Sequence, residues 1–484
     1  MVAAITEDTI NFQFEQLFKK SILPDHLKLK AGDTGIEIDA KLNAPTVSFS
    51  VPGTNRAILF MLNMPSGKFT YWDGFGSSAK QKTIDFTNWV YAFTVNLDLV
   101  AIAYDDVKKG SAVPQEVQDH LQQFNDSMFT ISHLFTDFED ADLASFDPGL
   151  TKMPLPDGSM ITPGQITQFQ QALQTYFTTL QGTDNPYILG YCVDTNTIAP
   201  STPPTFTPTG STFSIYSDPS IEGISTLNFL VMTNQTPLPT DPNAGIFSSN
   251  WVTNSESDGK FIISSDLFWI SWLLPLIQNS LGITNAPTPI TGGWSYSSNS
   301  QQQYTLKDDV KCISSLTMVD AHITMTDNRT ASVSYSNDTP TKVKVNLSGN
   351  LTMTYRNDFT CVFSEWMSET AKIDWTGKIT ISAGDDGQVA LDLDLDVPDA
   401  TKSTDGNWLG KGDIALIPDN KQLLNDIGGS YESSMKNTLN QFKNLLGPLH
   451  NRFILPAGDV FFYANAQLDP FNNLTMDITY KSQS

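Results

Sequence analysis

The side chains that most often carry out catalysis are dispersed in this sequence and form no known catalytic motif. Five histidines are present, and none belongs to an HExxH motif or a close His-x-His pair: His26, His120, His133, His322 and His450. There is no GxSxG motif for a nucleophilic serine, and the stretch Gly406–Gly412 lacks the spacing and the Ser or Thr of a phosphate-binding loop. We therefore predict that the protein is not an enzyme and expect no catalytic residues, no metal and no cofactor.

Two acidic clusters could still do chemistry. Asp392, Asp394 and Asp396 alternate with leucines, which places three carboxylates on one face of a strand about 7 Å apart. Such a face could contribute to a calcium site, but a solvated face that discourages edge-to-edge aggregation is the simpler interpretation. The second cluster lacks the glycine and the spacing of an EF-hand loop, and it comprises Asp137, Glu139, Asp140 and Asp142. We expect both clusters to be solvated.

Length and charge limit the function classes. A chain of 484 residues predicts two domains, and we place them at 1–255 and 256–484 because residues Thr253–Lys260 are polar and loop-like. The 28 Lys and Arg residues against 52 Asp and Glu residues give a formal charge of −24. Such a charge repels phosphate backbones, so we expect no nucleic-acid partner. It does not exclude an apolar ligand, whose affinity comes from burial.

The cysteines and the chain start bear on localisation. Cys192, Cys312 and Cys361 are too few and too widely spaced for a disulfide framework. The first residues lack the basic and apolar regions of a signal peptide, and no run of 18 apolar residues predicts a membrane-spanning segment. We expect a cytoplasmic protein, or one released without a classical signal peptide.

Hydrophobic periodicity predicts two blocks with the same order of elements. The first block begins with a helix at Ile10–Leu23 and contains a long helix at Gly164–Leu180. Thr162 is the predicted N-cap of the long helix, and Gln165 is its capping-box partner. A Pro- and Thr-rich loop is predicted at Thr195–Thr212. Its strands are predicted at Gly35–Leu42, Thr46–Val51, Arg56–Leu62, Lys68–Trp72, Tyr91–Tyr104, Met128–Phe138, Tyr187–Val193 and Thr226–Met232.

The second block begins with a helix at Leu267–Ile277 that is apolar on all sides and is therefore predicted to be buried. Strands fill most of Gly292–Asp396, a second long helix follows at Asn420–Leu446, and strands close the chain. The fold class is α+β, and a twisted antiparallel sheet that wraps a long helix in each block could enclose an apolar tunnel.

Both long helices carry an apolar and aromatic stripe. Core packing explains such stripes at least as well as a ligand tunnel, and the two interpretations stay open. If the tunnels are hollow, the residues that line them are predicted to be Ile166, Phe169, Leu173 and Phe177 on the first helix and Tyr431, Met435, Leu439 and Phe442 on the second.

Several segments resemble a known family. Leu227–Thr233, Pro237–Pro239, Ile246–Trp251, Phe261–Phe268 and Leu273–Pro275 are similar to stretches of the clostridial 47-kilodalton protein family, which is encoded beside botulinum neurotoxin genes with the Orf-X proteins. The segment Phe129–Phe138, which follows a predicted helix, resembles another stretch of that family.

The resemblance implies the tubular lipid-binding (TULIP) fold: two elongated modules, each a long helix wrapped by a highly curved antiparallel sheet. It also implies lipid binding, an accessory role beside a toxin or secreted product, and a protein partner from the same gene cluster. No catalytic residue comes with it.

The leading hypothesis is a non-enzymatic protein that binds lipid or another elongated apolar small molecule. The alternative is a structural accessory protein that docks on a partner protein without a small ligand.

Overall fold

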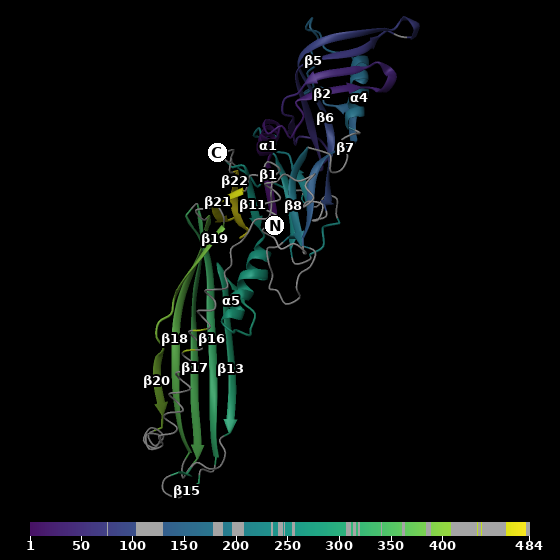
Figure 1. Cartoon of the computed structure of the whole chain (residues 1–484). Helices are drawn as coiled ribbons and strands as arrows, with labels where there is room; N and C mark the ends of the chain where they lie inside the picture. Colours follow the sequence, from purple (N-terminus) through teal and green to yellow (C-terminus); the bar gives the residue numbers. More distant parts are fainter. Residues whose placement is uncertain are drawn as a thin grey trace. The chain divides into compact units, whose positions relative to one another are not determined.

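The computed structural model is rich in antiparallel β-structure (Figure 1). It describes residues 1–74, 76–102, 129–177, 187–195, 208–233, 236–240, 245, 247–253, 257–305, 311–312, 316–317, 320–339, 341–360, 364–383, 389–407, 433, 437 and 461–480. The chain divides into two compact units. Unit 1 comprises Met1–Ile263, His450–Ala464 and Thr475–Ser484, and unit 2 comprises Ser264–Leu449 and Asn465–Leu474. The division of the sequence into modules 1–255 and 256–484 stays a prediction.

A six-stranded sheet has the order β21-β22-β11-β1-β10-β9. β1 was not among the predicted strands; it lies between β10 and β11 and pairs antiparallel with both. β9 begins inside the segment predicted to be a loop, so that prediction was wrong for its last residues. The strands are β1 (Val2–Thr6), β9 (Pro208–Tyr216), β10 (Thr226–Thr233), β11 (Gly259–Ile263), β21 (Phe461–Leu468) and β22 (Leu474–Tyr480).

The first helix, α1 (Glu7–Lys19), begins three residues earlier and ends four residues earlier than predicted. Thr6 is the N-cap and accepts a hydrogen bond from the Thr9 amide at 3.2 Å, with two acidic residues in the first turn. The helix ends well before Pro24 because Ser21 adopts a left-handed conformation with φ of 59°. Ile22, which falls within the predicted helix, consequently lies beyond α1 and is 43% exposed.

The second sheet of unit 1 has the order β2-β3-β5-β6-β7-β8, with β4 also paired to β5. The predicted strands Arg56–Leu62 and Lys68–Trp72 are one strand, β5, which continues through Pro65. Its Gly67 allows close contact, since a Cβ there would lie 2.5 Å from Phe86 and 2.8 Å from Ala40. The strands are β2 (His26–Lys30), β3 (Glu37–Lys41), β4 (Thr46–Ser48), β5 (Ala57–Asp73), β6 (Lys80–Ile102), β7 (Phe129–Phe146) and β8 (Ile188–Thr195), with short 3-10 turns η1 (Gly32–Thr34) and η2 (Gly76–Ser78).

Unit 2 is dominated by a sheet with the order β12-β13-β16-β17-β18-β19, in which β20 also pairs with β18 (Figure 1). β16, β17 and β18 are 20, 19 and 20 residues long and pair antiparallel along their lengths. The strands are β12 (Thr288–Ile290), β13 (Gly293–Thr305), β16 (Asp320–Thr339), β17 (Lys342–Thr360), β18 (Ser364–Ala383), β19 (Val389–Asp396) and β20 (Thr401–Gly406), and β14 (Lys311–Cys312) pairs separately with β15 (Leu316–Thr317).

The helix of unit 2 changes type along its length. A π-helical segment, η4 (Asp266–Leu273), continues into α5 (Leu274–Ser280). The change coincides with Pro275, which lacks the N–H that an ordinary helical hydrogen bond requires. The prediction that this helix is buried on all sides was wrong, because Ile270 is 53% exposed. At its C-terminus Gly282 adopts φ of 61°, and the Ile283 amide donates to the Gln278 carbonyl at 3.0 Å.

Candidate functional site

The first predicted tunnel helix is α4 (Pro163–Phe177) in unit 1. Its capping box is present: the Thr162 amide donates to Gln165 Oε1 at 2.8 Å, and the Gln165 amide donates to Thr162 Oγ1 at 3.4 Å. Of the predicted lining residues, Ile166 is half-buried, whereas Phe169, Leu173 and Phe177 are buried.

Aromatic rings surround the buried face of α4. Phe169 contacts Phe69, Trp89 and Tyr91, with ring centroids 5.6, 5.8 and 5.4 Å apart, and Phe177 contacts Phe93 at 5.2 Å. Polar atoms of this cluster have protein partners, since Trp89 Nε1 donates to the Pro154 carbonyl at 2.8 Å and Gln170 donates to Tyr91 at 2.9 Å. The described contacts of these predicted ligand residues are therefore with other side chains, and their role toward a ligand stays a prediction.

The second set of predicted ligand residues lies outside the described part of the chain. This set is Tyr431, Met435, Leu439 and Phe442. Their role also stays a prediction.

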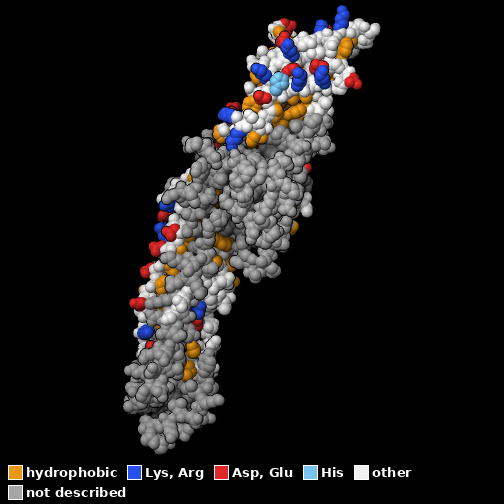
Figure 2. Space-filling model, viewed as in Figure 1, with side chains coloured by type: hydrophobic (Ala, Val, Ile, Leu, Met, Phe, Trp, Pro, Cys, Tyr) orange, Lys and Arg blue, Asp and Glu red, His pale blue; other side chains and the backbone are white. Residues whose placement is uncertain are grey.

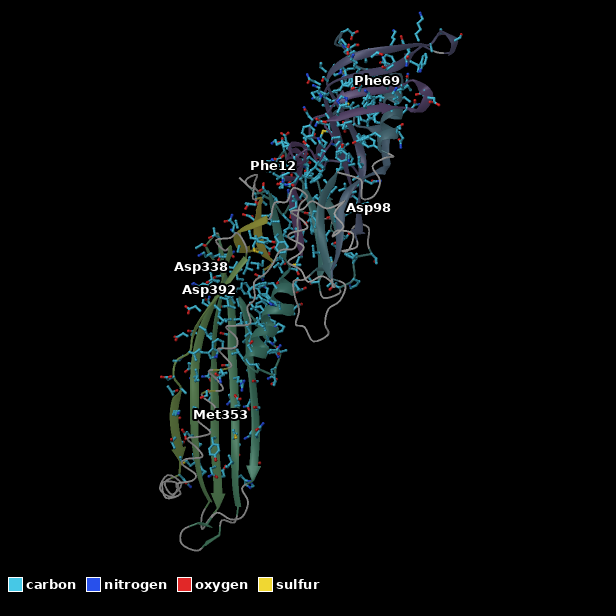
Figure 3. The ribbon with its side chains drawn as sticks, in the orientation of Figure 1. Phe12, Phe69, Asp98, Asp338, Met353 and Asp392 are labelled. Carbon is cyan, nitrogen blue, oxygen red and sulfur yellow. The ribbon has the colours of Figure 1, made fainter. Side chains whose placement is uncertain are left out.

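The sheet of unit 2 has two chemically different faces. We call the face that meets the helix the inner face: Trp269 of η4 contacts Trp294 at 5.1 Å, and Tyr296 donates to the Leu274 carbonyl at 3.0 Å. The strand register places odd-numbered residues of β17 and β18 on this face. Asp392, Asp394 and Asp396 lie on the opposite, outer face and are exposed, as the alternation predicted (Asp392 is labelled in Figure 3).

Part of the inner face forms a continuous strip, which we call the inner strip. It consists of facing pairs on β17 and β18: Gly349 with Trp375, Leu351 with Ile373, Met353 with Ala371, Tyr355 with Glu369, and Asn357 with Met367. Met353, labelled in Figure 3, lies at its middle. The nine residues from Gly349 to Asn357 span about 27 Å. Most of these side chains are buried, and those of Glu369 and Met367 are half-buried.

Each end of the inner strip carries a buried polar atom without a partner. Trp375 is 1% exposed and Asn357 is 5% exposed, yet Trp375 Nε1 and Asn357 Oδ1 have no hydrogen-bond partner in the described part of the chain. The Trp375 indole lies over Gly349, where a Cβ would be 2.5 Å from the ring. Unpaired buried polar groups are uncommon and costly, so both atoms need an explanation. Other such atoms occur in unit 1, on α1, β10 and β21 among other places, but not on the aromatic surface that faces α4.

The residues beside these atoms suit an adaptable apolar contact. Met325 on β16 lies opposite Tyr355 and diagonal to Met353, and Met367 lies opposite Asn357, so the Asn357 half of the inner face carries three methionines. Methionine is flexible and polarisable, and it is frequent at surfaces that accept varied apolar partners. Burial raises the pKa of Tyr355 to about 12, so its phenol stays neutral.

The inner strip was not predicted from the sequence, although the sequence contains a signal for it. Every second residue from Val343 to Tyr355 is apolar or glycine, and Asn357 continues that phase. A polar residue in the buried phase of a long alternating strand could have marked Asn357 as a candidate.

Two other features do not form a site. Lysines gather over the β2–β5 end of unit 1 (Figure 2), but Lys28, Lys30 and Lys68 form ion pairs with Asp39, Glu37 and Asp85 at 3.7, 2.7 and 3.9 Å. Among the described residues, no group of three or more His, Cys, Asp or Glu side chains could hold a metal ion.

No helix in the described part of the chain has the length and apolarity to cross a membrane.

Neither a protein-family model nor a curated protein matches the sequence. The similar solved structures include P47 of Clostridium botulinum E1 (TM-score 0.47, 14% identity, covering 99% of this chain and 98% of that one) and P47 from Clostridium botulinum A2 (TM-score 0.45, 13% identity, covering 99% and 96%). A lipopolysaccharide binding protein is also found, with a TM-score of 0.31, 10% identity and coverage of 100% and 99%. The two P47 structures are of the 47-kilodalton protein family that segments of the sequence resemble.

Proposed function

We propose that this protein is a non-enzymatic binding protein that holds an elongated apolar molecule along the inner strip of unit 2. The observation that carries the proposal is the pair of unpaired buried polar atoms, Trp375 Nε1 and Asn357 Oδ1, at the two ends of an apolar surface. Each unpaired atom costs about 1–3 kcal/mol of folding free energy, and a ligand with polar groups at matching positions would remove that cost.

The dimensions suit a lipid-like molecule. The strip is about 27 Å long, and an acyl tail that reaches from the surface to the middle of a bilayer spans about 15 Å. The strip is therefore long enough for a full tail together with a head group. Binding sites of this kind are mainly apolar, with a few polar groups that fix the orientation of the ligand.

The proposal includes the tubular arrangement implied by the resemblance, with a long helix wrapped by a curved sheet in each module. In support, α4 lies against β2, β5 and β7 in unit 1. The role as an accessory to a toxin or secreted product belongs to the same proposal and rests on the sequence resemblance alone.

Native mass spectrometry of the gently purified full chain, followed by titration with a neutral fluorescent alkyl probe, tests this function. We expect a co-purified amphiphile or saturable probe uptake, and weaker uptake by Met353→Asp, which places a charge in the strip. Asp392→Ala on the outer face is the matched control and should bind normally. Absence of both a co-purified lipid and probe uptake would reject the proposal.

A structural accessory role is the second candidate, and the outer face of unit 2 favours it. Every outward position of β13 from Ser295 to Gln303, and of β16 from Thr324 to Ser336, is Ser, Thr, Asn or Gln. This β13 and β16 part of the outer face is uncharged, unlike the part that carries Asp392, Asp394 and Asp396, and in a chain with a net charge of −24 it could contact a partner without like-charge repulsion. Recovery of a specific partner by pull-down, together with a filled inner strip, would favour this role.

A further inference from the structure

One long edge of the unit 2 sheet lacks a neighbouring strand. β13 pairs with β16 from Gly293 to Thr305, but on its other side it pairs with β12 over Gly293–Ser295 and with no other strand in the described part of the chain (Figure 1). The residues Asn299–Gln303 are all exposed, on both faces of the strand. This stretch, which we call the open edge, therefore presents backbone groups to solvent.

Two contacts indicate which residues direct their backbone groups outward. Asn285, which comes shortly before β12, donates through Nδ2 to the Ser297 carbonyl at 2.8 Å. Pro289 of β12, which has no N–H, lies opposite Trp294. Because consecutive residues of an antiparallel strand direct their N–H and C=O groups to opposite sides, both contacts indicate that the odd-numbered residues of β13 face the open side. On the open edge these residues are Asn299, Gln301 and Gln303.

The open edge lacks the features with which natural sheets prevent edge pairing. Residues Gly293–Thr305 contain no charged residue and no proline, and the register of β13 with β16 has no bulge. The opposite side of the same sheet differs, because β19 carries three aspartates and β20 carries Lys402 and Asp405. One side of the sheet is therefore protected against pairing with another strand, whereas β13 is suited to it.

The open edge is complementary to an identical strand. Antiparallel pairing about a two-fold axis at Gln301 places Gln301 opposite its own copy and Asn299 opposite Gln303 of the copy. In this register all three outward-facing residues form hydrogen-bonded pairs, which gives about six backbone hydrogen bonds. β12 and Asn285 leave this stretch accessible, because their contacts with β13 extend only as far as Ser297.

Charge also favours contact between two copies at this edge. The net charge of −24 makes two copies of the chain repel each other elsewhere. The open edge is uncharged, and the nearest charged residues of β16, Asp327 and Arg329, neutralise each other at 2.7 Å. A second copy that pairs here therefore brings no uncompensated charges of like sign into contact.

We propose that this protein associates with a second copy of itself by antiparallel pairing of β13, which joins the two unit 2 sheets into one continuous sheet. The dimer is expected to be weak and reversible, because so short a pairing buries less surface than a stable interface does. This inference does not depend on the proposed ligand.

Sedimentation equilibrium of the full chain, from low to high micromolar concentration, tests the self-association. We expect the weight-average mass to rise with concentration toward that of a dimer. Association should strengthen as salt is added, because salt screens the repulsion between two acidic chains. A chain that stays monomeric over the whole range would overturn the inference.

A proline substitution locates the interface. Gln301→Pro removes an outward-facing N–H and leaves the pairing with β16 intact, so it should keep the fold and weaken association at least about tenfold. Ser403→Lys on exposed β20, at the opposite side of the sheet, is the control and should associate normally. Dimerisation that survives in Gln301→Pro would overturn the assignment. So would capture of a different protein, lost in Gln301→Pro, by a wild-type chain that remains monomeric.

Two double variants test the register. Asn299→Lys with Gln303→Lys places like charges opposite each other and should abolish association, although it lowers the net negative charge. Asn299→Lys with Gln303→Glu places opposite charges there and should restore association to within about threefold of wild type. Circular dichroism shows whether both variants are folded. Equal association of the two variants would overturn the proposed pairing.

Discussion

The inner surface of unit 1 beside α4 and the inner strip of unit 2 are both apolar, but their polar atoms differ. In unit 1, Trp89 Nε1 and the Tyr91 hydroxyl have protein partners among closely spaced aromatic rings. In unit 2, Trp375 Nε1 and Asn357 Oδ1 lack partners in the described residues, and methionines replace the aromatic cluster. The two buried surfaces therefore differ in whether their polar atoms are satisfied, and this difference is our reason for proposing the ligand in unit 2.

The largest expected effect is in the aromatic core of unit 1. Phe169→Ala removes a ring that contacts three others and should lower the free energy of unfolding of unit 1 by about 3–5 kcal/mol. Urea denaturation measures this loss, and Ile166→Ala on the half-buried side of the same helix is the milder control. If Phe169→Ala folds but no longer binds the probe, the ligand site lies in unit 1, which would contradict the proposed difference between the two surfaces.

The next largest effect is expected at Gly349. A Cβ there would lie 2.4 Å from the Thr330 carbonyl oxygen and 2.5 Å from the Trp375 ring, so Gly349→Ala should destabilise unit 2 by about 1–3 kcal/mol and weaken ligand binding. Thermal denaturation and probe titration measure the two consequences. Gly292→Ala provides a contrast, since its surroundings are open and only its φ of 74° opposes the change. Normal stability of Gly349→Ala would show that the indole is not held against β17.

A substitution at Asn357 tests the unpaired atom itself. Asn357→Leu removes the unsatisfied acceptor and should stabilise the ligand-free protein by about 1–2 kcal/mol, contrary to the usual cost of changing a buried residue. Chemical denaturation of delipidated protein measures the change. Destabilisation would instead mean that Asn357 is hydrogen-bonded within the fold. Of the two unpaired atoms that distinguish the inner strip from the surface beside α4, Trp375 Nε1 alone would then remain.

The smallest effect concerns a carboxylate of unit 1 away from both surfaces. Burial raises the pKa of Glu7 above its ordinary value, partly offset by a hydrogen bond from the Phe49 amide at 2.6 Å. Because the folded pKa is raised, the folded state binds the proton more tightly, and this group's contribution to stability falls as the pH rises from 4.5 through the raised value. Glu7→Gln should therefore flatten the dependence of Tm on pH in this window. Exposed Glu15→Gln, measured over the same pH series, is the control, and an unchanged pH profile for Glu7→Gln would contradict the assignment.

Local patterns predicted much of this fold. The Thr162–Gln165 capping box, the buried positions Phe169, Leu173 and Phe177, and the outward carboxylates from Asp392 to Asp396 all follow from period and cap chemistry. The errors arose where tertiary context decides: β5 passes through Pro65, β9 begins in a Pro- and Thr-rich run, and Ser21 ends α1 early. The inner strip required the register of β17 with β18, because Trp375 and Asn357 become related only through that pairing.

Photolabelling with a neutral alkyl diazirine, followed by peptide mapping of the full chain, tests the central claim most directly. We expect labelling on peptides that contain Leu351–Asn357 and Met367–Trp375, and its suppression by an excess of the neutral alkyl probe. Saturable labelling confined to the peptides of Phe69, Phe93 and Phe169, with the strip unlabelled, would contradict it.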